Sequence, residues 1–412
     1  MHYFEYASAD ATLYEGPVTQ SQNTGMDEIL EIRKDTNNNA SIINVSRAVI
    51  KFDLTYISES ISSGLIPSSS SDPKFYLNLY DANSSNLTTS QSLYGYAVSQ
   101  SWTAGEGKFY DNPKDEEGVS WRYRHGKVDT TQWVSGSNNT GGTWYTGSGA
   151  EASQSFEWET TDMRMDVTDV MWRWIHNTVP NEGFMIKRSG SVGNADDNVE
   201  EGNTTKYGHF AFFSRETDTV YQPKLEVVWN DSTWATGSLN PLVTTDLEDL
   251  VVYMKGLRPD YKENSKVKFR LVGRERYPTK TYSTTTVSDS ITVKYLPSAS
   301  CYYQIKDAFT EDVMVPYGSG SYISSDSSGN YFNLWLNGLQ AERFYQIEYK
   351  VVSGSGVSET VNYYGGDLLG SFVNGEFIDN FSHIDKQTCF CGSDSDRINF
   401  LKKKKIGSCD DL

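Results

Sequence analysis

The chain has 412 residues, a formal net charge of −18 and a composition dominated by Ser, Thr, Asn, Gly and Tyr. This length allows two or three cores at roughly 100 to 200 residues per domain, and the composition is typical of β-sandwiches with long surface loops. The acidic balance argues against nucleic acid as a partner, and since no apolar run reaches about 18 residues, no membrane insertion is predicted.

Strand-like patterns dominate the first part of the chain and predict one or two sheets. We expect an N-terminal arm over residues 1–8, followed by a domain that ends near Asn230. Runs rich in β-branched and aromatic residues mark the strands. They cover residues 11–14, 28–33, 47–54, 75–80, 94–98, 183–187, 209–214 and 224–229.

One helix is predicted, over residues 165–177. Met165 and Val167 alternate with polar neighbours as in a strand, and Val170, Met171 and Trp174 then recur at helical spacing. We therefore expect a segment that begins as a strand and becomes a short helix laid over a sheet.

Residues 102–158 form a Gly-, Asn- and Ser-rich insert that nevertheless contains five tryptophans. A long loop with so many aromatic residues indicates an ordered, functional segment. Its rings could stack on sugars, or they could fill the insert's own core or a subunit interface, and we favour core or interface. The candidate residues are Trp102, Tyr110, Trp121, Tyr123, Trp133, Trp144 and Tyr145.

The second part of the chain begins with a linker over residues 231–249, where Gly237, Pro241 and a Ser/Thr run break any period. A smaller β-sandwich is predicted over residues 250–355, and a tail over residues 356–412. The strands of this smaller β-sandwich are expected at 250–254, 266–271, 291–296, 301–306, 331–336 and 344–352.

Eight short motifs between residues 9 and 230 resemble, in order and spacing, the DNRLRE-type domain. They are ADA at 9–11, RAVIKFDL at 47–54, SWTAGE at 101–106, VSW at 119–121, DVTDVMWRW at 166–174, NEGFMI at 181–186, FFSRE at 212–216 and QPKLEVVW at 222–229. The resemblance implies a jelly-roll β-sandwich related to carbohydrate-binding modules, as seen in bacterial surface proteins and bacteriophage structural proteins. The insert is longer than the family leads us to expect, so no ligand preference is carried over.

Structural roles are expected for several polar and aromatic residues within these motifs. In the family the SRE motif lies inside the sandwich, which implies that Arg215 is held by loop carbonyls or an acid, with Arg47 as its counterpart on the opposite strand. For the aspartates near the helix start, we favour interaction with the positive end of the helix dipole over a catalytic role. The residues assigned structural roles are Arg47, Asp53, Asp166, Trp174, Arg215 and Glu216.

The second domain carries a resemblance of its own. The run KYLPSASCYYQIKDAFTEDVMVPYG at 294–318, with SSGNYFNLWLNGLQAERFYQIEYKV at 327–351, resembles a module of virion structural proteins in large tailed phages. This resemblance implies a place on a virus particle.

No catalytic constellation, metal site or cofactor is predicted. Five scattered histidines offer no Ser-His or zinc arrangement. Cys389 and Cys391, with His383 and Cys409, could supply zinc ligands, but a single residue separates the paired cysteines, so free thiols are preferred. A polysaccharide-degrading enzyme would need two acids about 5 to 10 Å apart over an aromatic floor.

Together these observations predict an all-β protein, with an N-terminal jelly-roll β-sandwich bearing one short helix, linked to a smaller immunoglobulin-like β-sandwich. We expect a non-enzymatic structural component of a tailed-phage virion (neck, tail, baseplate, or head decoration or fibre), which displays the jelly roll and anchors through its C-terminal part. The alternative is a carbohydrate-binding module for host-surface adhesion. Expected partners are other virion proteins, further copies of the chain and a host glycan. Few cysteines and no apparent secretory signal suggest synthesis in the host cytoplasm.

Overall fold

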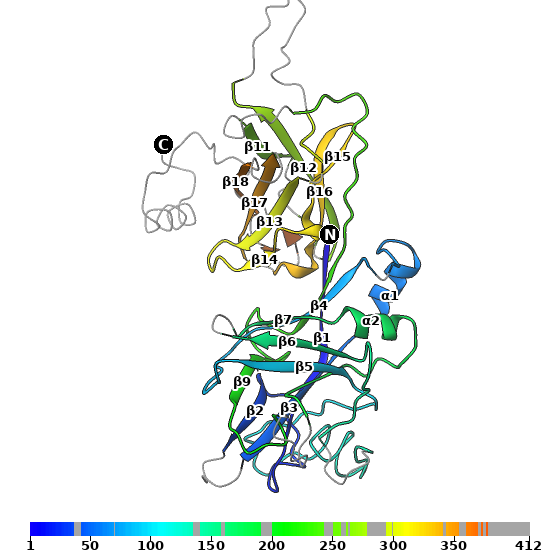
Figure 1. Cartoon of the computed structure of the whole chain (residues 1–412), viewed down its shortest axis with the longest axis vertical. Coiled ribbons are helices and arrows are strands. Elements are labelled where there is room, and N and C mark those ends of the chain that lie inside the picture. Colours follow the sequence, from blue (N-terminus) through cyan, green and yellow to red (C-terminus); the bar gives the residue numbers. More distant parts are fainter. Residues whose placement is uncertain are drawn as a thin grey trace, which may run out of the picture.

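Antiparallel strands build two domains that lie end to end (Figure 1). The all-β prediction is therefore confirmed. This computed structural model describes residues 1–36, 43–69, 71–134, 141–157, 161–190, 200–242, 250–256, 261–262, 264–277, 294–298, 300–340, 343–353, 360–369, 372–373 and 376–377.

The N-terminal domain is organised around one long strand, β1 (His2–Tyr14). Its first half pairs with β10 (Lys224–Val228) and its second half with β3 (Ile43–Phe52), with a register shift between Ala7 and Ala9. The strand order is β6-β5-β8-β3-β1-β10-β4-β7, and β2 joins β3 to β9. The remaining strands are β2 Ile29–Thr36, β4 Lys74–Leu79, β5 Gln91–Ala97, β6 Glu151–Phe156, β7 Met163–Asp166, β8 Phe184–Lys187 and β9 Gly208–Phe213.

The start of the chain differs from the prediction, because residues 2–8 belong to β1 and form no separate arm. They pair with β10 and bury Tyr3 and Phe4. Consecutive side chains of this part of β1 are buried, so both faces of the strand carry buried residues. The sequence therefore lacks the alternation that identifies a half-buried strand. Strand β6 was also missed, since its sequence EASQSF has few β-formers.

The predicted strand-to-helix segment is confirmed as β7 followed by α2 (Thr168–Ile175). Val170, Met171 and Trp174 are buried against the main core of the domain. A second helix, α1 (Thr55–Ser62), was not expected, because its Ser-rich sequence extends into a segment that reads as an exposed loop. Ile57 is fully buried on its inner face, and tertiary packing of that face outweighs the weak helix propensity.

The C-terminal domain is a sandwich of two four-stranded sheets, ordered β11-β12-β16-β15 and β14-β13-β17-β18. Stacked rings from both sheets fill its core, with Tyr303 and Phe332 centroids 4.2 Å apart. Its strands are β11 Leu250–Lys255, β12 Lys266–Glu275, β13 Cys301–Asp307, β14 Val313–Val315, β15 Ser324–Asp326, β16 Gly329–Trp335, β17 Tyr345–Ser353 and β18 Thr360–Leu369.

The sandwich extends beyond residue 355, since β18 pairs along β17 within the segment expected to be a tail. A small hairpin of β19 (Phe372–Val373) and β20 (Glu376–Phe377) follows. The cysteines at 389, 391 and 409, His383 and the lysine run at 402–405 lie outside the described residues, as do 291–293 of the expected strand at 291–296.

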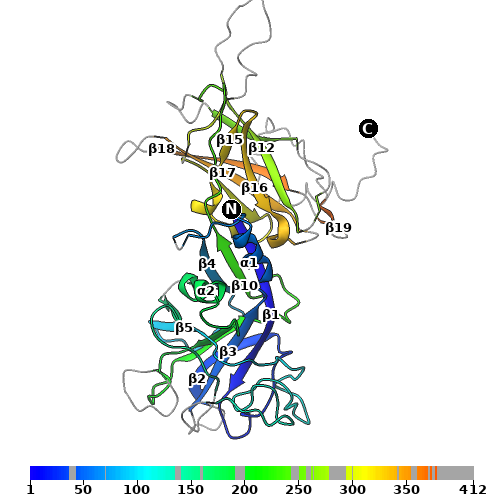
Figure 2. The same ribbon diagram turned by 90° about the vertical axis from the view of Figure 1, so that its right-hand side faces the viewer.

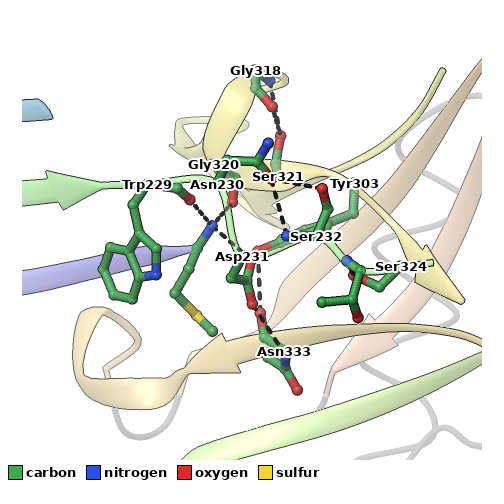
Figure 3. A network of polar contacts seen from close by, with 12 residues as sticks. Trp229, Asn230, Asp231, Ser232, Tyr303, Gly318, Gly320, Ser321, Ser324 and Asn333 are labelled. Carbon is green, nitrogen blue, oxygen red and sulfur yellow. Dashed lines mark hydrogen bonds and ion pairs between the residues drawn. The ribbon is translucent and has the colours of Figure 1, made fainter. Parts of the chain in front are cut away.

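Polar contacts fix the two domains to each other where the chain passes between them (Figure 3). The Met1 amino group donates to the carbonyl oxygens of Trp229, at 2.6 Å, and of Gly320 in the short helix η3 (Ser319–Ser321). It also pairs with Asp231 Oδ1 at 3.1 Å, and Asn333 Nδ2 donates to the other oxygen of Asp231 at 3.1 Å. The first residues of the predicted linker are thus part of a buried junction.

Apolar contacts complete this junction. Tyr3 stacks on Tyr56 of α1 at 4.9 Å, and Trp335 of the C-terminal domain packs edge-on against both rings. Phe4 belongs to the core of the C-terminal domain, although it lies on β1. Gly338, at the end of the short helix η4 (Leu336–Gly338), approaches the Phe4 ring so closely that a Cβ atom there would lie 2.2 Å from Phe4 Cδ2.

Candidate binding cleft

The tryptophans of the insert lie in a second core of the N-terminal domain. Trp102, Trp121 and Trp133 are 6%, 2% and 3% exposed. They pack against side chains on the outer face of β1, β3 and β8, including Val49 of β3 and Met185 of β8. Sugar stacking needs an accessible ring face, and these three rings have none to offer. Their geometry is that of the insert's own core.

The other aromatic candidates are distributed differently. Tyr123 is buried, Trp144 and Tyr145 are half-buried, and Tyr110 is 91% exposed. Trp158 lies outside the described residues. The structure therefore does not gather the predicted rings into one platform, and Tyr110 is the most exposed of the described candidates.

Arg47 is held in a buried ion cluster beneath the insert. Its guanidinium donates to Glu201 through Nε at 3.1 Å and NH2 at 2.6 Å, and lies over the Trp121 ring at 4.6 Å. Lys187 Nζ, 1% exposed, is 3.3 Å from the same carboxylate. The acid that holds Arg47 is therefore Glu201, which lies in a polar segment with no strand pattern, and Arg215 makes a separate set of contacts.

The other residues assigned structural roles make local contacts. Asp53 accepts the Thr55 N–H at 2.9 Å beside the start of α1, and Asp166 accepts the Thr168 N–H at 3.0 Å at the start of α2. Trp174 is buried, with its ring 4.6 Å from that of Phe184. These contacts order helix ends and core and leave no group directed at a ligand.

The SRE motif meets the first motif of the chain. Arg215, 43% exposed, donates through NH1 to the Ser8 carbonyl at 2.8 Å and lies 3.5 Å from Glu216. The Arg215 backbone N–H donates to the buried Asp10 carboxylate at 2.7 Å, and burial raises the pKa of Asp10 to about 7.

Replacing Asp10 with asparagine should make the protein more stable in alkaline solution. A carboxyl group whose pKa rises from 3.8 to about 7 on folding stabilises the native state fully below pH 3.8, and that contribution is lost as the pH rises from 3.8 to about 7. Between pH 5.5 and 8.5, the native chain should lose roughly 2 kcal/mol more unfolding free energy than Asp10→Asn. Urea denaturation at both pH values measures this, and equal losses in the two proteins would contradict it.

A cleft of about 630 Å³ is lined by outward-facing side chains of β2 and β9. Figures 1 and 2 show β2 at the end of the N-terminal domain that lies away from the C-terminal domain. Alternation along β2 buries Leu30, Ile32 and Lys34 and turns the intervening side chains outward. Its floor consists of the cross-strand pairs Glu31–Ala211 and Arg33–His209.

The insert supplies one wall of this cleft. Phe109 packs on Tyr14, the last residue of β1, with centroids 4.6 Å apart, and Tyr110 meets Phe109 edge-on at 5.2 Å. The Phe109 N–H donates to Asp27 Oδ1 at 3.0 Å, which ties the insert to the strand edge. Tyr14, Phe109 and Tyr110 thus form a row of contacting aromatic rings in the lining of the cleft.

The loop that carries Asn83 and Asn86 also lines the cleft. It pairs with β9, where Ser85 and His209 exchange two backbone hydrogen bonds of 3.0 Å. Gly208, with φ of 71°, permits this approach, since a Cβ atom there would lie 2.2 Å from the Asn86 carbonyl oxygen. The walls are therefore positioned by backbone contacts.

Carboxylates dominate the electrostatics of the cleft. Glu31 accepts hydrogen bonds from Tyr14 Oη at 3.1 Å and Arg33 NH2 at 2.9 Å. Burial, and then the Glu31 carboxylate, raise the pKa of Tyr14 well above its ordinary value, so this phenol remains a donor. Burial also raises the pKa of Asp27 to about 6. The cleft offers hydrogen-bond acceptors beside exposed aromatic surface.

The sequence did not reveal this cleft. Its only early signals are the alternation of Ile29, Glu31, Arg33 and Asp35 on β2 and the adjacent pair Phe109 and Tyr110. About 70 residues separate the two segments, and nothing local indicates that they meet.

Within the described ranges, no group of three or more His, Cys, Asp or Glu side chains is arranged to hold a metal ion. Cys301 is buried and free, and burial raises the pKa of its thiol to about 12. Neither α1 nor α2, nor any other helix in the described part of the chain, is long and apolar enough to span a membrane. No protein-family model matches this chain, and no curated protein matches its sequence.

Proposed function

We propose that this chain is a structural component of a tailed-phage virion that anchors through its C-terminal domain and displays the N-terminal domain. One observation carries the proposal: β1 begins at the buried junction and ends at Tyr14 in the cleft. Thirteen residues of strand span roughly 40 Å. The accessible cleft and the C-terminal domain therefore lie at opposite ends of one fixed body, as display requires.

The C-terminal domain carries features suited to attachment. Among the described strands, β18 is the last in the order of its sheet, and it exposes 40% of Val361 and 60% of Tyr363. An exposed strand edge with apolar and aromatic side chains favours pairing with another chain. This supports contacts with neighbouring virion subunits, including further copies of this chain.

Labelling of intact particles tests this proposal. An antibody against residues 9–230 should bind purified particles of the phage that encodes the chain, whereas an antibody against residues 250–369 should bind only after the particles are disrupted. Equal labelling of intact particles by both antibodies would contradict anchoring through the C-terminal domain.

A second candidate function is glycan binding at the distal cleft, and the exposed Tyr110 ring beside several acceptors favours it. Sugars combine apolar ring faces with hydroxyl donors, and this wall and floor offer complements to both.

Tyr110→Ala should weaken glycan binding at least about tenfold, because the lost ring is worth roughly 1.5 kcal/mol or more. A glycan array followed by titration of the best ligand measures this. Tyr277→Ala, which removes a 75% exposed ring from the C-terminal domain, is the matched control. If the array gives no signal, glycan binding is abandoned and the display proposal stands alone.

The proposed function includes no catalysis. Glu31 is held by Tyr14 and Arg33, and the Asp27 carboxylate by the Phe109 N–H, which suits fixed acceptors. Incubation with any glycan that binds should release no new reducing ends. If reducing ends are released and Asp27→Asn abolishes their release, the protein is instead a hydrolase. The raised pKa of Asp27 would then suit it to act as the general acid.

A further inference from the structure

We propose that the junction between the two domains opens in acid, and that protonation of the buried His2 side chain favours the open form. This inference goes beyond the virion role and glycan binding, because it concerns how the two domains are held together. It follows from the position of the His2 ring, which is 2% exposed and lies between β10 of the N-terminal domain and η3 of the C-terminal domain.

The two nitrogens of the His2 ring have different surroundings. Nδ1 lies 2.7 Å from Glu226 Oε1 on β10, and a neutral ring protonated at Nδ1 donates this hydrogen bond. Nε2 is buried and has no hydrogen-bond partner among the described residues. This edge of the ring lies against Gly320 of η3, where an added Cβ atom would be 2.7 Å from Nε2 and 3.0 Å from Cδ2. The closed junction therefore suits a neutral imidazole.

A proton on Nε2 would create a buried, charged N–H group without an acceptor, which is costly away from water. Glu226 compensates only in part, because Arg164 Nε already donates to its other oxygen at 2.9 Å. The Met1 amino group adds a neighbouring positive charge, which Asp231 pairs with at 3.1 Å. The short helix η3 has the sequence SGS and contributes no ionisable side chain.

These surroundings set the sign of the pH dependence. Burial lowers the pKa of His2 below its ordinary value of 6.5, Glu226 opposes this, and the charges of Met1 and Arg164 add to it. In the open form water reaches Nε2, so the ring titrates as an ordinary imidazole. The closed form is therefore favoured fully above pH 6.5 and loses stability as the pH falls below that value. Lys224, whose pKa burial lowers to about 8, remains charged in this range and does not contribute.

Thiol labelling of the full chain carrying Val228→Cys tests the proposal. Val228 is 7% exposed and is covered by Gly320, since an added Cβ atom there would lie 2.5 Å from Val228 Cγ1. Opening also withdraws Phe4 from the core of the C-terminal domain, so the open form is rare and is best detected by the labelling rate of a covered thiol.

The labelling rate at position 228 is located by peptide mass spectrometry and divided by the rate in the urea-unfolded chain at the same pH. This normalised rate should rise severalfold, and at most about 15-fold, between pH 6.5 and pH 5.0, because an ordinary imidazole gains its proton over this range. An unchanged or falling rate would overturn the proposal.

Three comparisons assign the rise to His2 and to the junction. His2→Asn keeps a donor for Glu226 but cannot titrate, and its normalised rate should change less than about twofold. His176→Asn removes an exposed imidazole at the end of α2 and should keep the full rise. Val49→Cys, fully buried beneath the insert, reports on the N-terminal domain away from the junction and should show no rise.

Two further outcomes would overturn the proposal. An equal rise in the His2→Asn protein would assign the effect to other groups, and a parallel rise at Val49→Cys would mean that acid unfolds the whole N-terminal domain. If His2→Asn does not fold, an NMR titration of the native chain decides. The His2 ring should take up its proton at a lower pH than in the urea-unfolded chain, and an equal or higher midpoint would contradict the proposal.

Discussion

Replacing Arg47 with alanine should lower the free energy of unfolding of the N-terminal domain by about 3–5 kcal/mol. Arg47 and Glu201 are 2% and 0% exposed, and two hydrogen bonds of 3.1 and 2.6 Å join them. Truncation leaves the Glu201 carboxylate buried with Lys187 as its remaining side-chain cation, at 3.3 Å. It also removes the guanidinium that lies over Trp121 and Trp144, at 4.6 and 5.0 Å.

Urea denaturation followed by tryptophan fluorescence measures this loss, because both rings report on the Arg47 environment. Arg215→Ala is the matched control, since this arginine is 43% exposed and its side chain makes one hydrogen bond, to the Ser8 carbonyl. Its cost should be about 1 kcal/mol or less. Equal costs for the two substitutions would show that the buried cluster does not stabilise the fold in this way.

Gly338→Ala should uncouple the two domains. The added Cβ would lie 2.2 and 2.7 Å from two atoms of the Phe4 ring, and that ring is enclosed in the core of the C-terminal domain. Since neither group can move freely, we expect η4 and β1 to separate, at a cost of about 1–3 kcal/mol. Small-angle X-ray scattering should show a larger radius of gyration, and limited proteolysis should cut within residues 231–242.

Gly318→Ala is the matched control for this prediction. Gly318 lies in the same domain next to η3, has an extended backbone with φ of 171° and has nothing within 4 Å of an added Cβ. Its scattering and cleavage pattern should match those of the native chain. A rigid, uncleaved Gly338→Ala protein would mean that the contact between Phe4 and Gly338 is not needed to hold the domains together.

Much of the fold follows from local patterns. The strand-to-helix segment around Met165 was predictable because the apolar period changes from two to about 3.6 within a few residues. The first residues of β1 and helix α1 were not, because Phe4 is buried in the core of the other domain and Tyr56 of α1 packs against Trp335, which lies 279 positions later in the chain. Contacts across such separations leave no local period in the sequence.

The candidate site was less predictable than the fold. Tryptophan content drew attention to the insert, but an aromatic ring's position in the sequence does not distinguish a core side chain such as Trp121 from an exposed one such as Tyr110. The partner of Arg47 was likewise unpredictable, because this partner is Glu201, which follows a polar segment without any strand period. Only the assembled sheet shows which outward-facing side chains of β2 meet Phe109 and Tyr110.

Cryo-electron microscopy of the intact particle, with this chain traced in place, tests the display proposal most directly. The proposal predicts that residues 250–369 contact neighbouring subunits and that the cleft bounded by Tyr110 and Glu31 faces solvent. A particle that lacks the chain, or one in which the cleft is covered by another subunit, would contradict it.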